Sequence, residues 1–205
     1  MECPSTAPAA FGLHPRAGFV LAGGHSSRMG RDKALLEIGG VPLLELAAAN
    51  VRKAAGSATV IAPPGRYGLL GLPCVADLVV DRGPLGGLYT ALTVSRAKWN
   101  LVLACDMPGV RAELLIALFE AAEESGHPAV VPRTAAGLEP LCAVYHRDVL
   151  PFVATALREN RLRMHDFVAS LDALLWPAPD GEVFRGANTP AEWSAAMLPE
   201  MPEAR

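Results

Sequence analysis

Residues 18–33 read GFVLAGGHSSRMGRDK, an apolar run that passes directly into a turn rich in glycine, serine and arginine. The run from Gly18 to Ala22 has the length and composition of a buried strand. After the turn, residues 42–54 have the pattern of a helix, with a proline near its start and Gly56 just past its end. A buried strand, a turn and a helix in this order are typical of the first unit of an α/β fold.

Strand and helix patterns continue to alternate along the chain. The expected strands, besides 18–22, are 58–62, 73–76, 99–105, 129–132 and 138–146, the last with an alternation that also suits an antiparallel strand. The expected helices, besides 42–54, are 85–95, 111–125, 149–158, 164–171 and one that starts near Pro190. This order predicts a single three-layer α/β domain, with a mostly parallel sheet and helices on both faces. The pattern does not give the strand order within residues 137–186.

The composition is that of one globular domain without a surface built for nucleic acid. Of 205 residues, 51% are hydrophobic and 19% are charged, and the net charge is -3. Residues 1–16 contain prolines and no periodicity, so we expect a flexible N-terminal extension there and one domain over residues 17–200.

The cysteines and the N-terminal segment indicate the cytoplasm. No two of the four cysteines form a C-x-x-C pair, and the histidines are scattered, so the sequence contains no zinc-binding motif. Nothing before residue 18 resembles a signal peptide, and no run of apolar residues is long enough to span a membrane. We therefore expect a cytoplasmic protein with neither membrane nor nucleic-acid partners.

The turn after the first expected strand suits a triphosphate. Gly23 and Gly24 allow backbone N–H groups to approach a phosphate, two serines add hydroxyl donors, and Lys33 closes a cluster of positive charge with Arg28 and Arg31. The stretch is neither a Walker A motif nor G-x-G-x-x-G. A solvated turn between a strand and a helix is the alternative interpretation.

Two carboxylates follow other expected strands. Asp106 comes directly after the apolar run 101–105, where an unpaired buried charge would be costly, so a metal ligand or a cap of the next turn explains it. Asp77 follows the strand 73–76 and suits either ligand binding or a turn, with Asp81 as a rival. Because ligands bind at the carboxyl ends of strands in such sheets, these residues and the Gly23–Lys33 turn could assemble one site.

Several motifs together resemble a known family. They are LAGGHSSRMGRDKALLEIGGVPLLE at 21–45, GPLGG at 83–87, CDMP at 105–108, EPLCAVYHR at 139–147 and NTP at 188–190. This set is similar to the motifs of the molybdenum cofactor guanylyltransferases, within the wider group of nucleoside-triphosphate transferases. The resemblance covers residues 18–195, and it implies a Rossmann-like nucleotidyltransferase domain.

The resemblance also implies an activity and a set of site residues. The activity is transfer of GMP from GTP to the terminal phosphate of molybdenum-bearing molybdopterin, with Mg²⁺ as cofactor. The implied nucleotide-binding residues are Leu21, Ala22, Gly23, Lys33, Asp77 and Asp106, of which Lys33 and Asp106 are catalytic and Asp106 binds the metal. Asn188 resembles a family asparagine in the NTP motif and is a candidate for the acceptor side, with a helix-start residue as the alternative. Apart from the resemblance, the positive charges of Arg161 and Arg163 make them candidates for binding the anionic acceptor, with a solvated helical surface as the alternative. Molybdoenzymes or their chaperones would receive the product.

One segment departs from the family pattern. Several relatives carry asparagines after the second strand that help to bind the nucleotide, whereas this chain has VIAPPGR at 60–66. Two alternatives to guanylyl transfer to molybdopterin therefore stay open within the same chemistry: a molybdopterin cytidylyltransferase, and a transferase acting on a sugar or polyol phosphate. A nucleotide-binding accessory protein without turnover is the alternative from another class.

Overall fold

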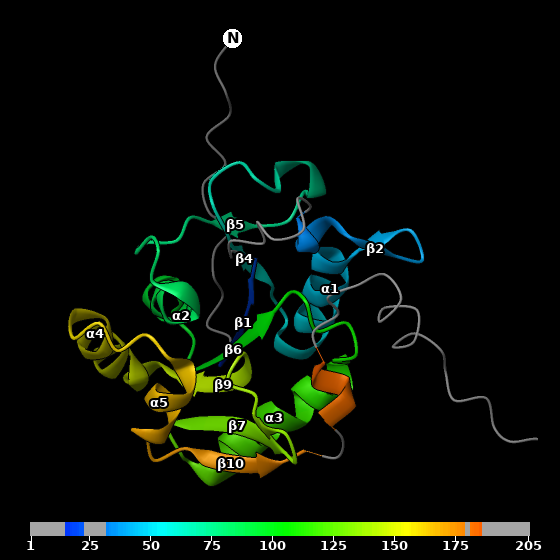
Figure 1. The fold of residues 1–205 in the computed structure, drawn as a ribbon. Helices are drawn as coiled ribbons and strands as arrows, with labels where there is room; N and C mark the ends of the chain where they lie inside the picture. The colour runs from blue at the N-terminus through cyan, green and yellow to red at the C-terminus, as the bar shows by residue number, and fades with distance from the viewer. Residues whose placement is uncertain (1–14, 23–31, 179–180, 186–205) are drawn as a thin grey trace, which may run out of the picture.

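A sheet of eight strands forms the centre of the molecule. The computed structural model describes residues 15–22, 32–178 and 181–185. The strand order is β10-β7-β9-β6-β1-β4-β5, with β8 added beside β7. The bounds are β1 Arg16–Leu21, β4 Thr59–Ile61, β5 Cys74–Val75, β6 Trp99–Ala104, β7 Ala129–Thr134, β8 Gly137–Leu138, β9 Cys142–His146 and β10 Leu174–Pro177. In Figure 1, β1 and β6 lie side by side in the middle of this sheet.

The sheet is mixed, although most of its pairs are parallel. β1 pairs in parallel with both β4 and β6, β4 with β5, and β7 with β10. β9 runs antiparallel to its neighbours β6 and β7, and β8 runs antiparallel to β7. The chain therefore has a parallel half, built from β5, β4, β1 and β6, in which the carboxyl ends of the strands share one edge.

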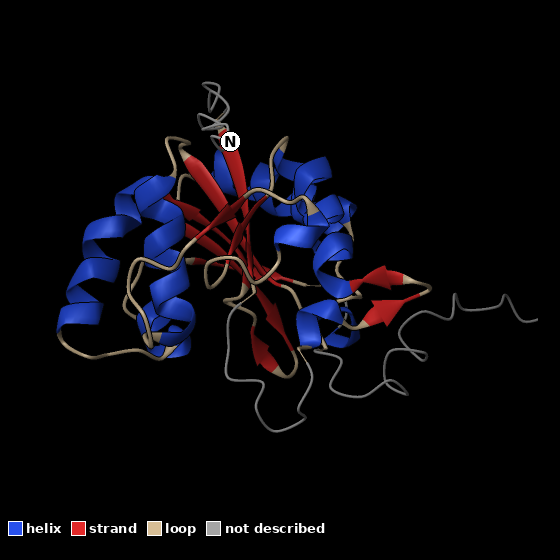
Figure 2. Cartoon of the chain, turned by 90° about the horizontal axis from the view of Figure 1, so that it is seen from above, coloured by secondary structure: helices blue, strands red, loops and turns tan. Residues whose placement is uncertain are grey.

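Helices cover both faces of the sheet, as Figure 2 shows from above. The helices are α1 Leu43–Ala55, α2 Gly83–Val94, α3 Ala112–Ser125, α4 Leu150–Arg158 and α5 Met164–Ala169. The core cluster on one face contains residues of α1 and α3, and the cluster on the other contains residues of α2, α4 and α5. Short 3-10 helices occur at η1 Lys33–Leu35, η2 Gly68–Leu70, η3 Arg147–Val149 and η4 Gly181–Phe184, and a small hairpin joins β2 Glu37–Ile38 to β3 Val41–Pro42.

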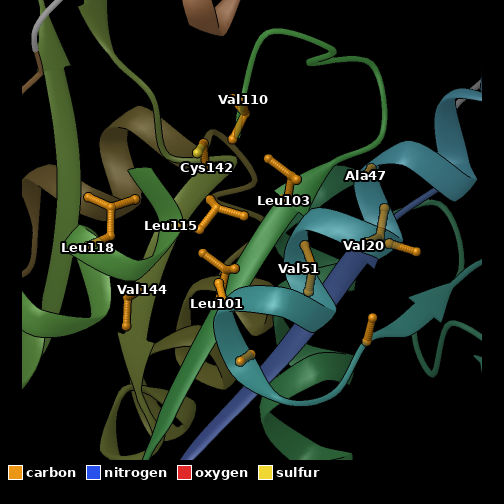
Figure 3. Packing of buried hydrophobic residues seen from close by; sticks show 14 of the residues in the cluster. Val20, Ala47, Val51, Leu101, Leu103, Val110, Leu115, Leu118, Cys142 and Val144 are labelled. Atoms are coloured by element: carbon orange, nitrogen blue, oxygen red, sulfur yellow. The ribbon is translucent and has the colours of Figure 1, made fainter. Parts of the chain in front are cut away.

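The alternation of side chains along β1 and β6 explains the two core clusters. Val20, Leu101 and Leu103 face α1 and α3, whereas Phe19 and Val102 face α2 and α4. In Figure 3, Leu101 and Leu103 of β6 lie between Val51 of α1 and Leu115 of α3. All strand residues of β6 are buried, which is typical of a central strand covered on both faces.

The expected fold class is confirmed. The helices and parallel strands begin and end within two residues of the expected bounds, and β9 is antiparallel, as its alternation suggested. The single expected strand over 138–146 is wrong, because Glu139–Leu141 separate β8 from β9. β10 and the β2–β3 hairpin were not expected, and β1 begins at Arg16, inside the segment expected to be an extension. The helix expected near Pro190 lies outside the described residues, and within them no helix is long and apolar enough to cross a membrane.

Candidate active site

A pocket opens at the carboxyl edge of the parallel half of the sheet. Leu21 and Ala22 line it from the end of β1, and Ala104, Cys105 and Asp106 line it from the end of β6. The remaining lining residues are Asp32, Lys33 and Ala34 around η1, Tyr67 after β4, Pro84 at the start of α2, and Leu141 before β9. Adjacent parallel strands place their carboxyl ends at one edge, so segments far apart in sequence meet there.

Backbone hydrogen bonds fix the floor of the pocket. The N–H of Cys105 donates to the carbonyl of Leu21 over 3.2 Å, which extends the β1–β6 ladder to the rim. The N–H of Ala104 donates to Leu141 over 2.8 Å, and that of Ala22 donates to Ile61 over 3.0 Å. Asp106 directly follows Cys105, so its backbone leaves the sheet where the pocket opens.

Lys33 and Asp106 face each other across the pocket. The Nζ atom of Lys33 lies 3.9 Å from Oδ2 of Asp106, and the two side chains are 24% and 35% exposed. The pocket thus presents a cation and a carboxylate together, both partly exposed. A cation suits phosphate oxygens, and a carboxylate suits a hard metal ion that also binds phosphate.

Asp32 is the most heavily bonded carboxylate at the site. Its Oδ1 accepts from the N–H of Ala34 over 3.2 Å and caps η1, while Oδ2 accepts from Nε of Arg66 over 2.7 Å. The hydroxyl of Tyr67 donates to the same carboxylate, with distances of 3.1 and 3.0 Å to its two oxygens. Burial, followed by the charge of Asp32, raises the pKa of Tyr67 above its usual range, so the phenol stays protonated and remains a donor.

The surroundings of Cys105 disfavour the thiolate form that a nucleophile requires. Desolvation raises the pKa of its thiol to about 12, and the neighbouring charges of Asp106 and Asp32 act in the same direction. A thiol with this pKa is protonated at neutral pH, and the thiolate is the reactive form. Cys105 is thus a partly buried thiol in its unreactive, protonated form.

The segment GPLGG forms the start of α2 and packs against the end of β1. Gly83 has a φ of +58°, which favours glycine at the first residue of the helix. A Cβ atom on Gly87 would lie 2.8 Å from Cδ2 of Leu21, so a glycine there lets α2 approach the strand. This close approach brings Pro84 to the pocket wall.

Asp77 lies away from the pocket lining and organises the turn before α2. Its Oδ1 accepts from the hydroxyl of Thr90 over 2.7 Å and from the N–H of Val79 over 3.4 Å. Thr90 is fully buried, and its hydroxyl also accepts from the N–H of Leu78 over 3.0 Å. These bonds match the interpretation of Asp77 as a turn residue, and its contact with a base stays a prediction.

The acceptor-side candidates Arg161 and Arg163 lie at the turn between α4 and α5, and neither lines the pocket. Arg161 forms an ion pair with Glu159 over 2.7 Å, and Arg163 precedes the first residue of α5. A hydrogen bond of 2.7 Å from Arg82 to Asn160 ties this turn to the residue before α2. Gly23 and Asn188 lie outside the described residues.

Sequence reasoning found four of the pocket residues and missed others. Leu21, Ala22, Lys33 and Asp106 come together as predicted. Asp32, Tyr67 and Leu141 were not singled out. Asp32 stands directly before Lys33 in the quoted motif and was available as a signal, and Leu141 lies in the quoted EPLCAVYHR. No pattern in the sequence pointed to Tyr67.

Comparison with known proteins shows which family the chain belongs to. Residues 18–174 match the model of the MobA-like NTP transferase domain. The chain belongs to this family. It is 33% identical over 171 residues to a protein of Flavobacterium johnsoniae named "Probable molybdenum cofactor guanylyltransferase", covering 83% of this chain and 89% of that one. It is 35% identical over 179 residues to a Nostoc protein of the same name, covering 84% and 86%.

The fold also matches solved structures of nucleotidyltransferases. Molybdopterin-guanine dinucleotide biosynthesis protein A from Archaeoglobus fulgidus superposes with a TM-score of 0.72 at 24% identity, covering 87% of this chain and 95% of that one. As a member of the MobA-like NTP transferase family, the chain is a nucleotidyltransferase. The pocket that joins β1, β6 and η1 is the candidate place for its chemistry.

Proposed function

We propose that this MobA-like NTP transferase transfers GMP from GTP to the terminal phosphate of molybdenum-bearing molybdopterin. The observation that carries the proposal is the meeting of Lys33 and Asp106 in one pocket at the carboxyl edge of the sheet. The names of the relatives support the base and the acceptor. The products are the guanine dinucleotide cofactor and pyrophosphate.

Magnesium is the proposed cofactor, with Asp106 as its protein ligand. Mg²⁺ is commonly bound through one or two carboxylates together with substrate phosphates, rather than by a cage of protein ligands. The described residues fit this mode, because the carboxylate of Asp106 is 35% exposed in the pocket and lies beside the ammonium group of Lys33. When bound, the ion supplies neutralisation of the phosphate charge.

The reaction requires alignment of the two substrates and neutralisation of phosphate charge, and it requires no catalytic base. An oxygen of the acceptor phosphate attacks the α-phosphorus of GTP, forming the new P–O bond, while the bond to the bridging oxygen breaks and pyrophosphate leaves. A phosphate oxygen is already anionic at neutral pH, so no side chain has to remove a proton. Positioning of the two phosphates and stabilisation of the developing charge then account for catalysis.

Each site residue has a proposed role in that alignment. The ammonium group of Lys33 neutralises phosphate charge as a compact cation. The backbone of Leu21, Ala22 and Gly23 holds the nucleotide. Arg161 and Arg163 receive the anionic acceptor together with Asn188, and Arg161 exchanges its ion pair with Glu159 for the acceptor when it binds.

The choice of guanine rests on Asp77 and on the names of the relatives. A carboxylate accepts from both N1–H and the exocyclic amine of guanine, a pair of donors that cytosine and adenine do not present together. Of the two Asp77 oxygens, Oδ1 accepts from Thr90 and Val79, so base recognition would use Oδ2 or rearrange the turn. A cytidylyltransferase is the alternative, since 60–66 lacks the asparagines of some relatives.

The deciding experiment measures pyrophosphate released from GTP, CTP or ATP with molybdenum-bearing molybdopterin and Mg²⁺. We expect release only with GTP, only with the acceptor present, and none after chelation of the metal. Release with CTP alone would replace guanylyl by cytidylyl transfer. Nucleotide binding without release from any of the three would instead indicate a non-catalytic accessory protein.

A further inference from the structure

The carboxylate of Asp32 joins two segments that come from different parts of the chain. It caps η1, the turn that carries Lys33, through the N–H of Ala34. It also receives the guanidinium of Arg66 and the hydroxyl of Tyr67, which both lie in the loop after β4. Asp32 therefore links the segment that carries Lys33 to the loop that carries Tyr67, and both line the pocket.

The Tyr67 end of this link is firmly anchored. The side chain of Tyr67 is only 3% exposed and belongs to the core cluster that contains Val20 and Leu103. Arg66 lies over the ring of Tyr67, with its Cζ atom 5.8 Å from the ring centroid. Hydrogen bonds to a charged carboxylate are stronger than bonds between neutral groups. The buried side chain of Tyr67 therefore restrains the carboxylate of Asp32.

The Lys33 end of the link depends on outside contacts, which are the cap by Asp32 and the burial of Ala34 in the core. η1 has only three residues, and such a short 3-10 helix is not stable without outside contacts. A lysine side chain also has many rotamers, so its ammonium group is well placed only if its backbone is fixed. Lys33 directly follows Asp32, and its Nζ atom stands 3.9 Å from Asp106.

We infer that Asp32, held by Tyr67 and Arg66, is a positioning residue that fixes Lys33 opposite Asp106. Asp32 acts through Lys33 rather than by contact with the reacting atoms. The inference rests on the proposed function for its catalytic meaning, because the role of Lys33 at phosphate belongs to that proposal. The placement of Lys33 itself is tested separately from turnover.

The first test measures how fast an amine-reactive acetylating reagent modifies Lys33, followed by peptide mass spectrometry. In the wild type, we expect partial burial and the contact with Asp106 to shield Lys33 from the reagent. We expect Asp32→Ala and Tyr67→Phe to speed modification of Lys33 by roughly tenfold, the change that corresponds to one lost hydrogen bond to a charged group. Lys53, 65% exposed and paired with Glu113, serves as the internal reference in every sample.

Glu123→Gln is the matched control. It removes a carboxylate that receives Arg16 over 2.7 and 2.6 Å, away from the residues that line the pocket. It must leave the modification of Lys33 unchanged. Tyr67→Phe loses only a hydroxyl, so it decides the question if Asp32→Ala does not fold. An unchanged rate at Lys33 in folded Tyr67→Phe overturns the inference.

The second test is a double-mutant cycle in nucleotidyl transfer. If Asp32 acts through Lys33, Tyr67→Phe lowers kcat/KM by about tenfold in the wild type and hardly at all in the Lys33→Ala background. Equal losses in both backgrounds would assign Tyr67 a general structural role and overturn the inference. If the wild type shows no transfer at all, the proposed function fails, whereas the acetylation rates still decide whether Asp32 positions Lys33.

Discussion

The Nζ atom of Lys33 lies 3.9 Å from Oδ2 of Asp106, although one residue follows the end of β1 and the other follows the end of β6. Both side chains are partly exposed, and an ion pair in such a position contributes at most about 1 kcal/mol to the free energy of unfolding. Folding therefore gains little from this pair. Under the proposed function, the pair instead holds opposite charges at the place where a metal-bound phosphate would sit.

Asp106→Asn is expected to abolish nucleotidyl transfer while leaving the melting temperature nearly unchanged. The amide keeps the shape of the side chain but loses the charge that a divalent cation requires. Pyrophosphate release and differential scanning calorimetry measure the two properties. Asp172→Asn, at a side chain that is 89% exposed, makes the same chemical change and should be fully active. Normal turnover of Asp106→Asn would remove this residue from the metal site.

Lys33→Ala is expected to lower kcat/KM by roughly 100-fold, the scale on which enzymes lose rate when one preorganised group at a developing charge is removed. Steady-state kinetics with GTP measure the loss, and thermal unfolding should change little. Lys33→Arg should not restore the rate, because a planar guanidinium does not replace a compact ammonium group. Lys53→Ala is the control at an exposed lysine, and unchanged kinetics in Lys33→Ala would remove Lys33 from the catalytic residues.

The sequence predicted the parallel half of the sheet well because its strands are apolar runs bounded by turn residues. β6 is buried along its whole length, so its pattern was unambiguous. β10 is an edge strand of four residues in which half-buried and exposed residues alternate, which gives a weak signal. The β2–β3 hairpin turns at Gly39 and Gly40, with φ of +59° and +81°, a glycine pair that is typical of tight hairpins and was available as a signal.

The sequence predicted part of the site for a similar reason. Carboxyl ends of adjacent parallel strands share an edge, so Leu21 and Asp106 could be brought together without knowing any loop. Tyr67 could not be placed, because its contact with Asp32 depends on the path of the loop after β4. Pairings between loops are set by tertiary packing, and local patterns do not encode them.

Glu123→Gln is expected to destabilise the protein at neutral pH by up to about 1 kcal/mol, the usual limit for an exposed ion pair. The hydrogen bond from Arg16 lowers the pKa of Glu123 below the ordinary value of 4.5 for this side chain. A lowered pKa in the folded state means that the stabilisation is complete above the unfolded pKa and is lost as the pH falls through the folded pKa. The difference between variant and wild type should therefore shrink below pH 4.5.

Urea unfolding at several pH values measures this difference. Glu124→Gln, at an exposed neighbour in the same helix, is the control for removing a negative charge from α3. A difference for Glu123→Gln that stays constant from neutral pH to pH 3 would show that the ionised carboxylate is not the stabilising group.

Asp77→Ala is expected to remove most of the preference for GTP. A carboxylate that accepts from two donors of guanine is left without partners by cytosine or adenine, which costs about 1–3 kcal/mol, or more for a charged group. The wild type should then bind GTP at least roughly tenfold more tightly than CTP or ATP, as measured by calorimetric titration with each nucleotide.

The same substitution also removes the hydrogen bonds from Asp77 to Thr90 and Val79, so base recognition must be separated from loss of the turn. Thr90→Val is the matched control, because it removes the hydroxyl that Asp77 accepts from and keeps the carboxylate. If Asp77 reads the base, Thr90→Val weakens all three nucleotides alike, whereas Asp77→Ala weakens GTP most. If both variants weaken the three nucleotides equally, Asp77 serves the turn before α2 alone. Equal affinities in the wild type would rule out guanine selection by this pocket and leave nucleotidyl transfer standing.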